Sequence, residues 1–246
     1  MTHPNEQADR AERGPTDLDG PPDDEHLYEI RFGEPDDDLR PICQGDVYAG
    51  ICLPTYDGEH DHVILGTHPC SMRKGADLRP RVQAFAVVRH QHVDPGRWPG
   101  GFKKVMPLPS MTDTEHHAGE LVDTGPVTPE QLAEATRVAT LSHLGILLLQ
   151  QRIIWTLAHT VVRLDTLAEQ TAPALAELEL LEHWNEQCCA HLEGEDRAVV
   201  LAQTARDFDG YMTDELRDAL TSPERIAAAR IQIREEARRR GEALRG

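Results

Sequence analysis

The residues best suited to chemistry lie in one stretch, "HDHVILGTHPCSMRKG", at residues 60–75. Histidine changes charge near neutral pH, so it can donate or accept a proton during a reaction. Arginine can hold a phosphate through two parallel hydrogen bonds. The combination suits cleavage of a phosphodiester without a metal. In that chemistry His68 would be the proton-transfer group and Arg73 the phosphate contact, with His62 as a further candidate.

The same stretch has a second interpretation, as a zinc site. His60 and His62 are separated by one residue, so on a strand they would share a face, and the same holds for His68 with Cys70. Together the two pairs offer four zinc ligands. Two more cysteines precede them: Cys43 and Cys52. Structural zinc sites usually show tighter spacings, and neither HExxH nor CxxC occurs, so we expect no metal and no other cofactor.

Basic side chains follow this stretch at short intervals. They would extend a positive surface suited to RNA: Lys74, Arg79, Arg81, Lys103 and Lys104. Trp98 lies among them and could stack on a base, because aromatic rings bind single-stranded nucleic acid in this way. We expect these six residues to contact nucleic acid. The alternative is a solvated scatter of charge that binds no ligand.

Net charge limits where nucleic acid could bind. The chain carries 43 acidic and 25 basic residues, a formal net charge of −18. The excess lies in residues 1–40 and 121–223, whereas residues 41–120 hold 9 acidic and 8 basic residues. Most of the surface would therefore repel nucleic acid. A phosphate-binding site is expected within residues 41–120 or near the C-terminus.

The cysteine pattern and the hydropathy indicate a cytoplasmic protein. The five cysteines are odd in number and show no disulfide framework, which fits a reducing compartment. The first twenty residues hold no apolar segment typical of a secretory signal. The longest apolar run, "LGILLL", is far shorter than the roughly 20 residues of a membrane-spanning helix. We expect no contact with a membrane.

The elements that must position these groups change in character along the chain. Residues 1–40 are rich in Asp, Glu, Pro and Gly, which predicts a disordered acidic tail. Residues 41–142 hold short apolar and β-branched runs such as "GDVYAGICL" and "VQAFAVV", separated by turn signals, which predicts a small β-barrel. Helical patterns fill residues 143–246. The expected fold class is α+β: a small β-barrel followed by a helical C-terminal half that packs on it.

Helix signals are clear at three places. Thr128, Pro129 and Gln131 have the pattern of an N-cap, a first-turn proline and a capping box. Residues 144–157 are apolar nearly all round, which predicts a buried central helix, preceded by a short strand in "RVATL". In "APALAELELLEHWNEQCCAHL", apolar residues recur every three or four positions, which predicts an amphipathic helix. Its apolar face consists of Leu178, Leu181, Trp184 and Cys188.

Four motifs occur in the order found in a known family. "QGDVYAG" is followed by "HVILGTHP", then by "VMPLPS" and then by "RVATLSHLG". In this order they resemble the strands of the MazF/PemK family of toxin ribonucleases, over about residues 44–145. The resemblance implies an SH3-like barrel. It also implies an RNA-binding or endoribonuclease protein of a toxin–antitoxin or bacterial defence system.

Two functional positions of that family are not matched. The family carries a catalytic arginine just before the second of these strands, where this chain has "GEHDHV" and no arginine. The family's catalytic threonine follows the third strand, where this chain has Pro109 and Ser110. Either the chemistry has moved to neighbouring residues or the barrel has no ribonuclease activity. In the first case the resemblance places Ser110 near His68 and Arg73 as a hydrogen-bond donor. The expected catalytic set is then His62, His68, Arg73 and Ser110.

Two functions of different classes follow from these patterns. The first is cleavage or binding of RNA by a MazF-like barrel. The second is a non-catalytic interaction protein whose barrel and helical half bind a protein partner or a second copy of the chain. The order of the motifs and the basic residues favour RNA, whereas the net charge favours a protein partner. The sequence leaves open whether the protein is an enzyme.

Overall fold

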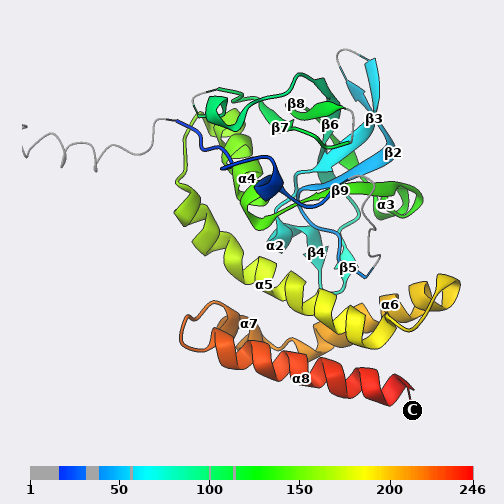
Figure 1. The fold of residues 1–246 in the computed structure, drawn as a ribbon. Coiled ribbons are helices and arrows are strands. Elements are labelled where there is room, and N and C mark those ends of the chain that lie inside the picture. The colour runs from blue at the N-terminus through cyan, green and yellow to red at the C-terminus, as the bar shows by residue number, and fades with distance from the viewer. Residues whose placement is uncertain (1–16, 32–38, 56–57, 100, 113–114, 246) are drawn as a thin grey trace, which may run out of the picture. The chain divides into compact units, whose positions relative to one another are not determined.

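The computed structural model describes residues 17–31, 39–55, 58–99, 101–112 and 115–245 (Figure 1). It confirms the predicted α+β class, with a curled antiparallel sheet in the N-terminal half and helices in the C-terminal half. The chain divides into two compact units, described below as the first and the second unit. The first unit takes its described residues from Met1–Asp36, Gln44–His68 and Pro80–Glu169. The second takes them from Asp37–Cys43, Pro69–Arg79 and Gln170–Gly246.

The first unit is built on a seven-stranded sheet with the strand order β1-β9-β2-β3-β6-β8-β7. All the described strand pairs in it are antiparallel. The strands are β1 (Tyr28–Ile30), β2 (Asp46–Thr55), β3 (Gly58–Leu65), β6 (Val82–His90), β7 (Val105–Leu108), β8 (His116–Val127) and β9 (Thr136–Leu141). The shorter helical elements of this unit are η1 (Glu25–Leu27), η2 (Pro95–Arg97) and α3 (Pro129–Glu134). The β-rich character predicted for this part of the chain is confirmed.

The capping box predicted at the start of α3 is confirmed. The backbone N–H of Gln131 donates to the hydroxyl oxygen of Thr128, and the Gln131 side chain accepts from the Thr128 N–H at 3.0 Å. Pro129 opens the helix, where a missing N–H costs nothing. These local bonds fix the start of α3, the helix that precedes β9.

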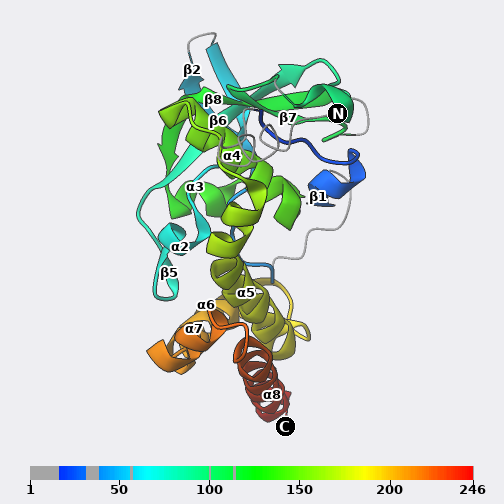
Figure 2. The same cartoon turned by 90° about the vertical axis from the view of Figure 1, so that its left-hand side faces the viewer.

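Helix α4 (His143–Ala158) covers the sheet, and Figures 1 and 2 show it beside β7 and β8. Ile146, Leu148 and Leu149 are at most 1% exposed. The predicted buried central helix is therefore confirmed. Because its apolar stripe is broad, the helix needs the apolar face of a sheet to cover it.

The domain boundary predicted between residues 142 and 143 is wrong. Helix α4 and the first residues of α5 (Leu164–Cys189) belong to the first unit together with the sheet. A change from strand to helix along the chain marks a change of local structure only. The packing of α4 against the sheet decides where the compact unit ends.

Residues 17–31 are folded, so the disorder predicted for residues 1–40 is wrong in this part. Strand β1 pairs with β9, and three apolar side chains of the segment are buried: Leu18, Leu27 and Tyr28. Average composition predicted a tail because acidic residues surround these side chains. A few well-placed apolar groups are enough to anchor the segment. Residues 1–16 and 32–38 lie outside the described residues.

Buried polar groups of α4 also hold this segment. Gln151 accepts from the Asp19 N–H at 2.7 Å and donates to Asp19 Oδ2 at 2.8 Å. Arg152 is fully buried and donates to the Asp19 carbonyl oxygen at 2.9 Å. Its guanidinium lies 4.7 Å from the centre of the Trp98 ring. Burial lowers the pKa of Arg152 to about 10, so the group remains charged at neutral pH.

The second unit is mainly helical. Its elements are α2 (Pro69–Met72), β4 (Arg73–Lys74), β5 (Asp77–Leu78), most of α5, α6 (Gly194–Tyr211), α7 (Asp214–Leu220) and α8 (Ile226–Arg245). Trp184 is fully buried at its core, with ring centroids 5.5 Å from Phe208 and 5.4 Å from Tyr211. A Cβ added at Gly241 would lie 2.2 Å from the Gln187 carbonyl oxygen, which shows that helices α8 and α5 approach closely.

None of the helices in the described ranges has the length and apolar character of a membrane-spanning segment. The longest of them, α5, carries acidic residues along its length.

Candidate functional site

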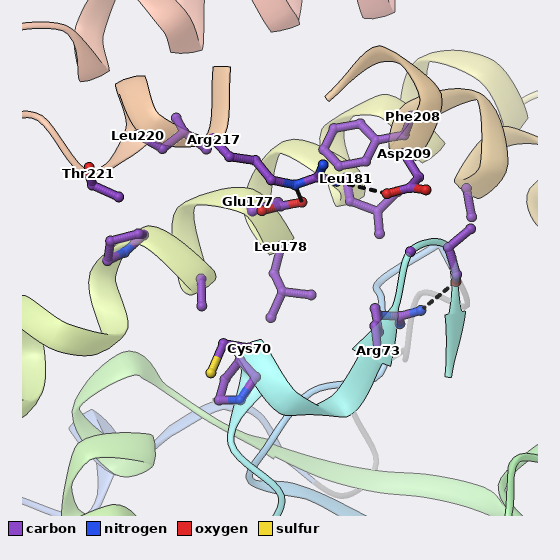
Figure 3. A pocket seen from close by; sticks show the side chains of 16 residues that line it. Cys70, Arg73, Glu177, Leu178, Leu181, Phe208, Asp209, Arg217, Leu220 and Thr221 are labelled. Atoms are coloured by element: carbon purple, nitrogen blue, oxygen red, sulfur yellow. Dashed lines mark hydrogen bonds and ion pairs between the residues drawn. The ribbon is translucent and has the colours of Figure 1, made fainter. Parts of the chain in front are cut away.

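A cavity of about 570 Å³ opens in the second unit (Figure 3). Its walls come from α5, α6, α7 and the segment that holds α2, β4 and β5. Small-molecule sites usually enclose about 300–1,000 Å³ and combine apolar walls with a few polar groups. The cavity is therefore the candidate functional site of the described chain.

Apolar side chains form most of the cavity wall. Leu178 and Leu181 come from α5, Phe208 from α6 and Leu220 from α7. The first two belong to the apolar face predicted for α5, and Figure 3 shows Leu178 projecting into the middle of the cavity. Leu181 and Phe208 are otherwise buried in the core, so the cavity is continuous with the apolar interior of the unit.

One wall carries three charged groups, called here the Arg217 cluster: Glu177, Asp209 and Arg217. The Nε of Arg217 donates to Glu177 Oε1 at 3.1 Å, and its Nη2 donates to Asp209 Oδ1 at 2.8 Å. Its Nη1 donates to the carbonyl oxygen of Met212. Burial opposes ionisation, but the two carboxylates outweigh it, so the pKa of Arg217 is raised. Two carboxylates share one guanidinium, so the cluster has one excess negative charge.

The opposite wall carries Cys70 and Arg73, which Figure 3 shows across Leu178 from the Arg217 cluster. Arg73 is half-buried and donates to the carbonyl oxygens of Ala76 at 3.2 Å and Ile42 at 3.4 Å. These bonds hold the guanidinium at the β4–β5 hairpin. Arg73 therefore braces the hairpin at this wall of the cavity.

Gly75 makes the tight turn of this hairpin and has a φ of +65°, a conformation that strains other residues. A Cβ at this position would also lie 2.8 Å from Asp209 Oδ2. The turn therefore lies directly against the carboxylate on α6. A larger residue at this position would be strained by the positive φ and would require the Asp209 carboxylate to shift.

The predicted catalytic residues are divided between the two units. His62, His68 and Ser110 belong to the first unit, and Arg73 belongs to the second. His68 lies between β3 and α2, directly before α2, and is half-buried, and burial lowers its pKa. Of the four, Arg73 lines the cavity.

His62 and Ser110 contact opposite faces of the sheet. The His62 ring lies 6.0 Å from the ring of His117, whereas the Ser110 N–H donates to Nδ1 of His116 at 2.9 Å. His116 and His117 are consecutive residues of β8, so their side chains point to opposite faces. This arrangement argues against one site that contains both predicted residues.

Most of the predicted RNA-binding residues are accessible. Four of them are exposed: Lys74, Arg79, Arg81 and Lys104. Lys103 is half-buried, with its ammonium 5.2 Å from the centre of the Trp155 ring. The prediction that Trp98 stacks on a base is wrong, because its side chain is fully buried and its indole N–H donates to the Val93 carbonyl oxygen at 3.3 Å.

The zinc interpretation finds no support in the described side chains. Among them, no three His, Cys, Asp or Glu side chains gather in a way that could hold a metal ion. Cys43 is buried, and Cys52 and Cys70 are exposed. The side chain of His60 is not among the described residues.

Sequence patterns did not single out the Arg217 cluster. Glu177, Asp209 and Arg217 each lie on an amphipathic helix, where a charged residue usually marks a solvated face. No motif spacing connects them, because they come from three different helices. The one local signal was the apolar stripe of α5, which includes Leu178 and Leu181.

These features define a class of site: a mainly apolar cavity with a few charged side chains in its walls, suited to binding an apolar group. A comparison of the chain with models of protein families and with curated protein sequences found no match. We therefore infer function from the geometry and chemistry of this chain.

Proposed function

We propose that this is a non-catalytic binding protein and that the cavity of its second unit receives an apolar group of its partner. The observation that carries the proposal is a cavity of about 570 Å³ with leucine and phenylalanine walls and few polar groups. A ligand that covers apolar surface of a cavity removes that surface from water, which makes the free energy of binding more favourable. Burial of one leucine- or phenylalanine-sized side chain contributes about 1.5–3 kcal/mol.

The polar groups of the cavity suit orientation of a ligand better than proton transfer. Arg217 binds two carboxylates and a backbone carbonyl oxygen, and Arg73 binds two backbone carbonyl oxygens. The raised pKa of Arg217 keeps its guanidinium protonated over the whole physiological range. A general base must instead exchange a proton near the working pH.

A cavity-filling variant tests this proposal. Ala174 lines the cavity on α5, and Ala172 is exposed on the same helix. Ala174→Trp should lower the affinity for an environment-sensitive apolar dye by about tenfold or more, measured by fluorescence titration, because the indole occupies the space of the ligand. Ala172→Trp is the matched control and should bind the dye as the unmodified protein does. Equal dye affinity in both variants would refute the proposal.

RNA binding or cleavage by a MazF-like protein is a second candidate. The specific observation in its favour is the curled antiparallel sheet, which agrees with the fold that the family resemblance implies. Exposed basic side chains such as Lys104 and Arg81 add to it. Incubation with total RNA, with and without EDTA, tests cleavage and its metal dependence together. Intact RNA, with no salt-dependent binding in a filter assay, would remove this candidate.

A further inference from the structure

The cavity of the second unit places negative charge beside apolar surface. Glu177 and Leu178 are neighbours on α5, Phe208 and Asp209 are neighbours on α6, and all four line the cavity (Figure 3). We propose that the cavity receives a basic and apolar segment of a protein partner, in which a lysine stands next to leucine-sized side chains. This inference rests on the proposed function, because it names the partner chemistry of the same cavity.

The carboxylates of the Arg217 cluster have acceptors left for a second cation. Glu177 and Asp209 each use one oxygen, Oε1 and Oδ1, to accept from Arg217. Within the described part of the chain, no hydrogen bond occupies the second oxygen of either carboxylate. Their side chains are 33% and 36% exposed, so a partner can reach them. A lysine ammonium has three N–H donors and would offset the excess negative charge of the cluster.

The charges at this wall favour a cation over an anion. Each nitrogen of Arg217 already donates a hydrogen bond, to Glu177, Asp209 or the Met212 carbonyl oxygen. An anion would therefore meet the excess negative charge of the cluster, in a chain with a net charge of −18. Arg73 is bonded to backbone carbonyl oxygens on the facing wall, so a lysine at the cluster would lie across Leu178 from it.

Apolar surface beside the cluster fits the rest of the segment. Leu178 projects into the cavity, and Pro173 and Leu220 also line it. A lysine side chain can lay its four methylene groups along such a surface while its ammonium group reaches a carboxylate. The volume of about 570 Å³ leaves room for a leucine side chain as well. Tight binding should therefore require both the positive charge and the neighbouring apolar groups.

Calorimetric titration of the full chain with four capped peptides tests the inference. Acetyl-Lys-Leu-Leu-amide, acetyl-Gln-Leu-Leu-amide and acetyl-Glu-Leu-Leu-amide differ in one side chain, and acetyl-Lys-Ser-Ser-amide keeps the charge without the leucines. We expect the Lys-Leu-Leu peptide to bind about tenfold more tightly than the Glu-Leu-Leu peptide, with the glutamine peptide between them and no measurable binding of Lys-Ser-Ser. The preference for lysine should shrink as the salt concentration rises. Equal affinity of the lysine and glutamate peptides, or tighter binding of the glutamate peptide, would overturn the inference.

Isosteric variants assign the preference to the cluster. Glu177→Gln removes one negative charge and keeps an oxygen that can accept from Arg217. It should lower the affinity for the lysine peptide to that for the glutamine peptide, and Asp209→Asn repeats the test from α6. Glu235 is exposed on α8 and does not line the cavity, so Glu235→Gln is the control for net charge and should keep the preference. Melting temperatures show whether each variant stays folded, and an equal loss of preference in the control would contradict the assignment.

The dye titration separates failure of this inference from failure of the proposed function. If the dye binds and Ala174→Trp removes it while the peptides show no preference for lysine, the cavity is a binding site of another specificity and this inference alone is wrong. If neither the dye nor any peptide binds, both are wrong.

Discussion

Arg73 shows how one side chain can satisfy two different hypotheses. Its position after "HPCSM" and its chemistry made it the predicted phosphate contact. In the structure it braces the β4–β5 hairpin through backbone carbonyl oxygens and lines the cavity. A structural role and a role in RNA cleavage make different predictions for the same substitution.

Arg73→Ala should lower the melting temperature, because it removes charge-assisted bonds to Ala76 and Ile42 that contribute about 1.5–3 kcal/mol each at most. Thermal unfolding followed by circular dichroism checks this. If RNA cleavage is the function, Arg73→Ala should instead abolish cleavage while the melting temperature barely moves. In that case Arg73→Lys should restore little, because a point charge cannot reproduce a bidentate fork.

His117 makes the first unit sensitive to acid. Burial, and then the neighbouring His62, lower the pKa of His117, so the folded state favours the neutral ring. The resulting stabilisation is complete above the unfolded-state pKa of about 6.5 and is lost as the pH falls below it. Burial lowers the pKa of His68 in the same direction.

We therefore expect the free energy of unfolding to fall between pH 7.5 and pH 5.5, measured with urea. His117→Gln should make this dependence shallower, because the substituted side chain does not titrate. His191→Gln changes an exposed histidine and is the control, with an unchanged slope. A slope that is the same in all three proteins would show that His117 does not carry the acid sensitivity.

At the scale of elements, helix α4 shows how an apolar sequence pattern corresponds to the burial of side chains. Its sequence is apolar nearly all round, and the structure covers it with the sheet and η1. Leu148 is fully buried, whereas Leu157, nine residues later on the same helix, is 76% exposed. The two leucines form a matched pair for mutation.

Leu148→Asp should cost several kcal/mol of stability, because an unpaired carboxylate would replace apolar packing. Leu157→Asp should change the melting temperature little. Soluble yield and thermal unfolding of the two variants provide the measurement. A Leu148→Asp protein that melts like the unmodified chain would mean that α4 is not the core of its unit.

Two helical glycines allow the same test of packing in the second unit. Helix propensity favours alanine over glycine by about 0.5–1 kcal/mol. At Gly210 nothing lies within 4 Å of an added Cβ, so Gly210→Ala should stabilise the protein by about that amount. At Gly241 the added atom would meet the Gln187 carbonyl oxygen at 2.2 Å, so Gly241→Ala should destabilise by about 1–3 kcal/mol. Urea unfolding gives both values, and a stabilising Gly241→Ala would show that α8 and α5 are not closely packed.

For the whole molecule, the segment 17–31 joins the acidic N-terminal region to the core. It contributes strand β1, the buried side chains of Leu18 and Leu27, and the backbone groups of Asp19 that bind α4. Each fully buried leucine contributes about 1.5–3 kcal/mol. Loss of the segment would also leave Arg152 without its partner at Asp19.

Removal of residues 1–31 should therefore lower the melting temperature strongly and increase aggregation, because it exposes the edge of β9. Removal of residues 1–16 alone keeps every one of these contacts and serves as the control. Differential scanning calorimetry of the two truncated proteins compares them directly. Equal melting temperatures would contradict the anchoring role of residues 17–31.

Sequence patterns that span only a few residues were enough to predict several elements of the secondary structure. The capping box at Thr128, the strand "RVATL" and the central helix follow from spacings of two to four residues, and the structure has all three. The α+β class follows from the order of these elements. Average composition failed at residues 17–31, because it does not register three apolar side chains at anchoring positions.

The candidate site depends on contacts that no local pattern contains. Asp209 and Arg217 meet Glu177, which lies 40 residues before Arg217, and Arg73 comes from a different part of the chain. Trp98 was expected at the surface and is buried, since Arg152 from α4 covers its ring. Periodicity reports only which side of an element is apolar. Which elements meet, and therefore which charges face one cavity, is set by packing between segments that are far apart in the sequence.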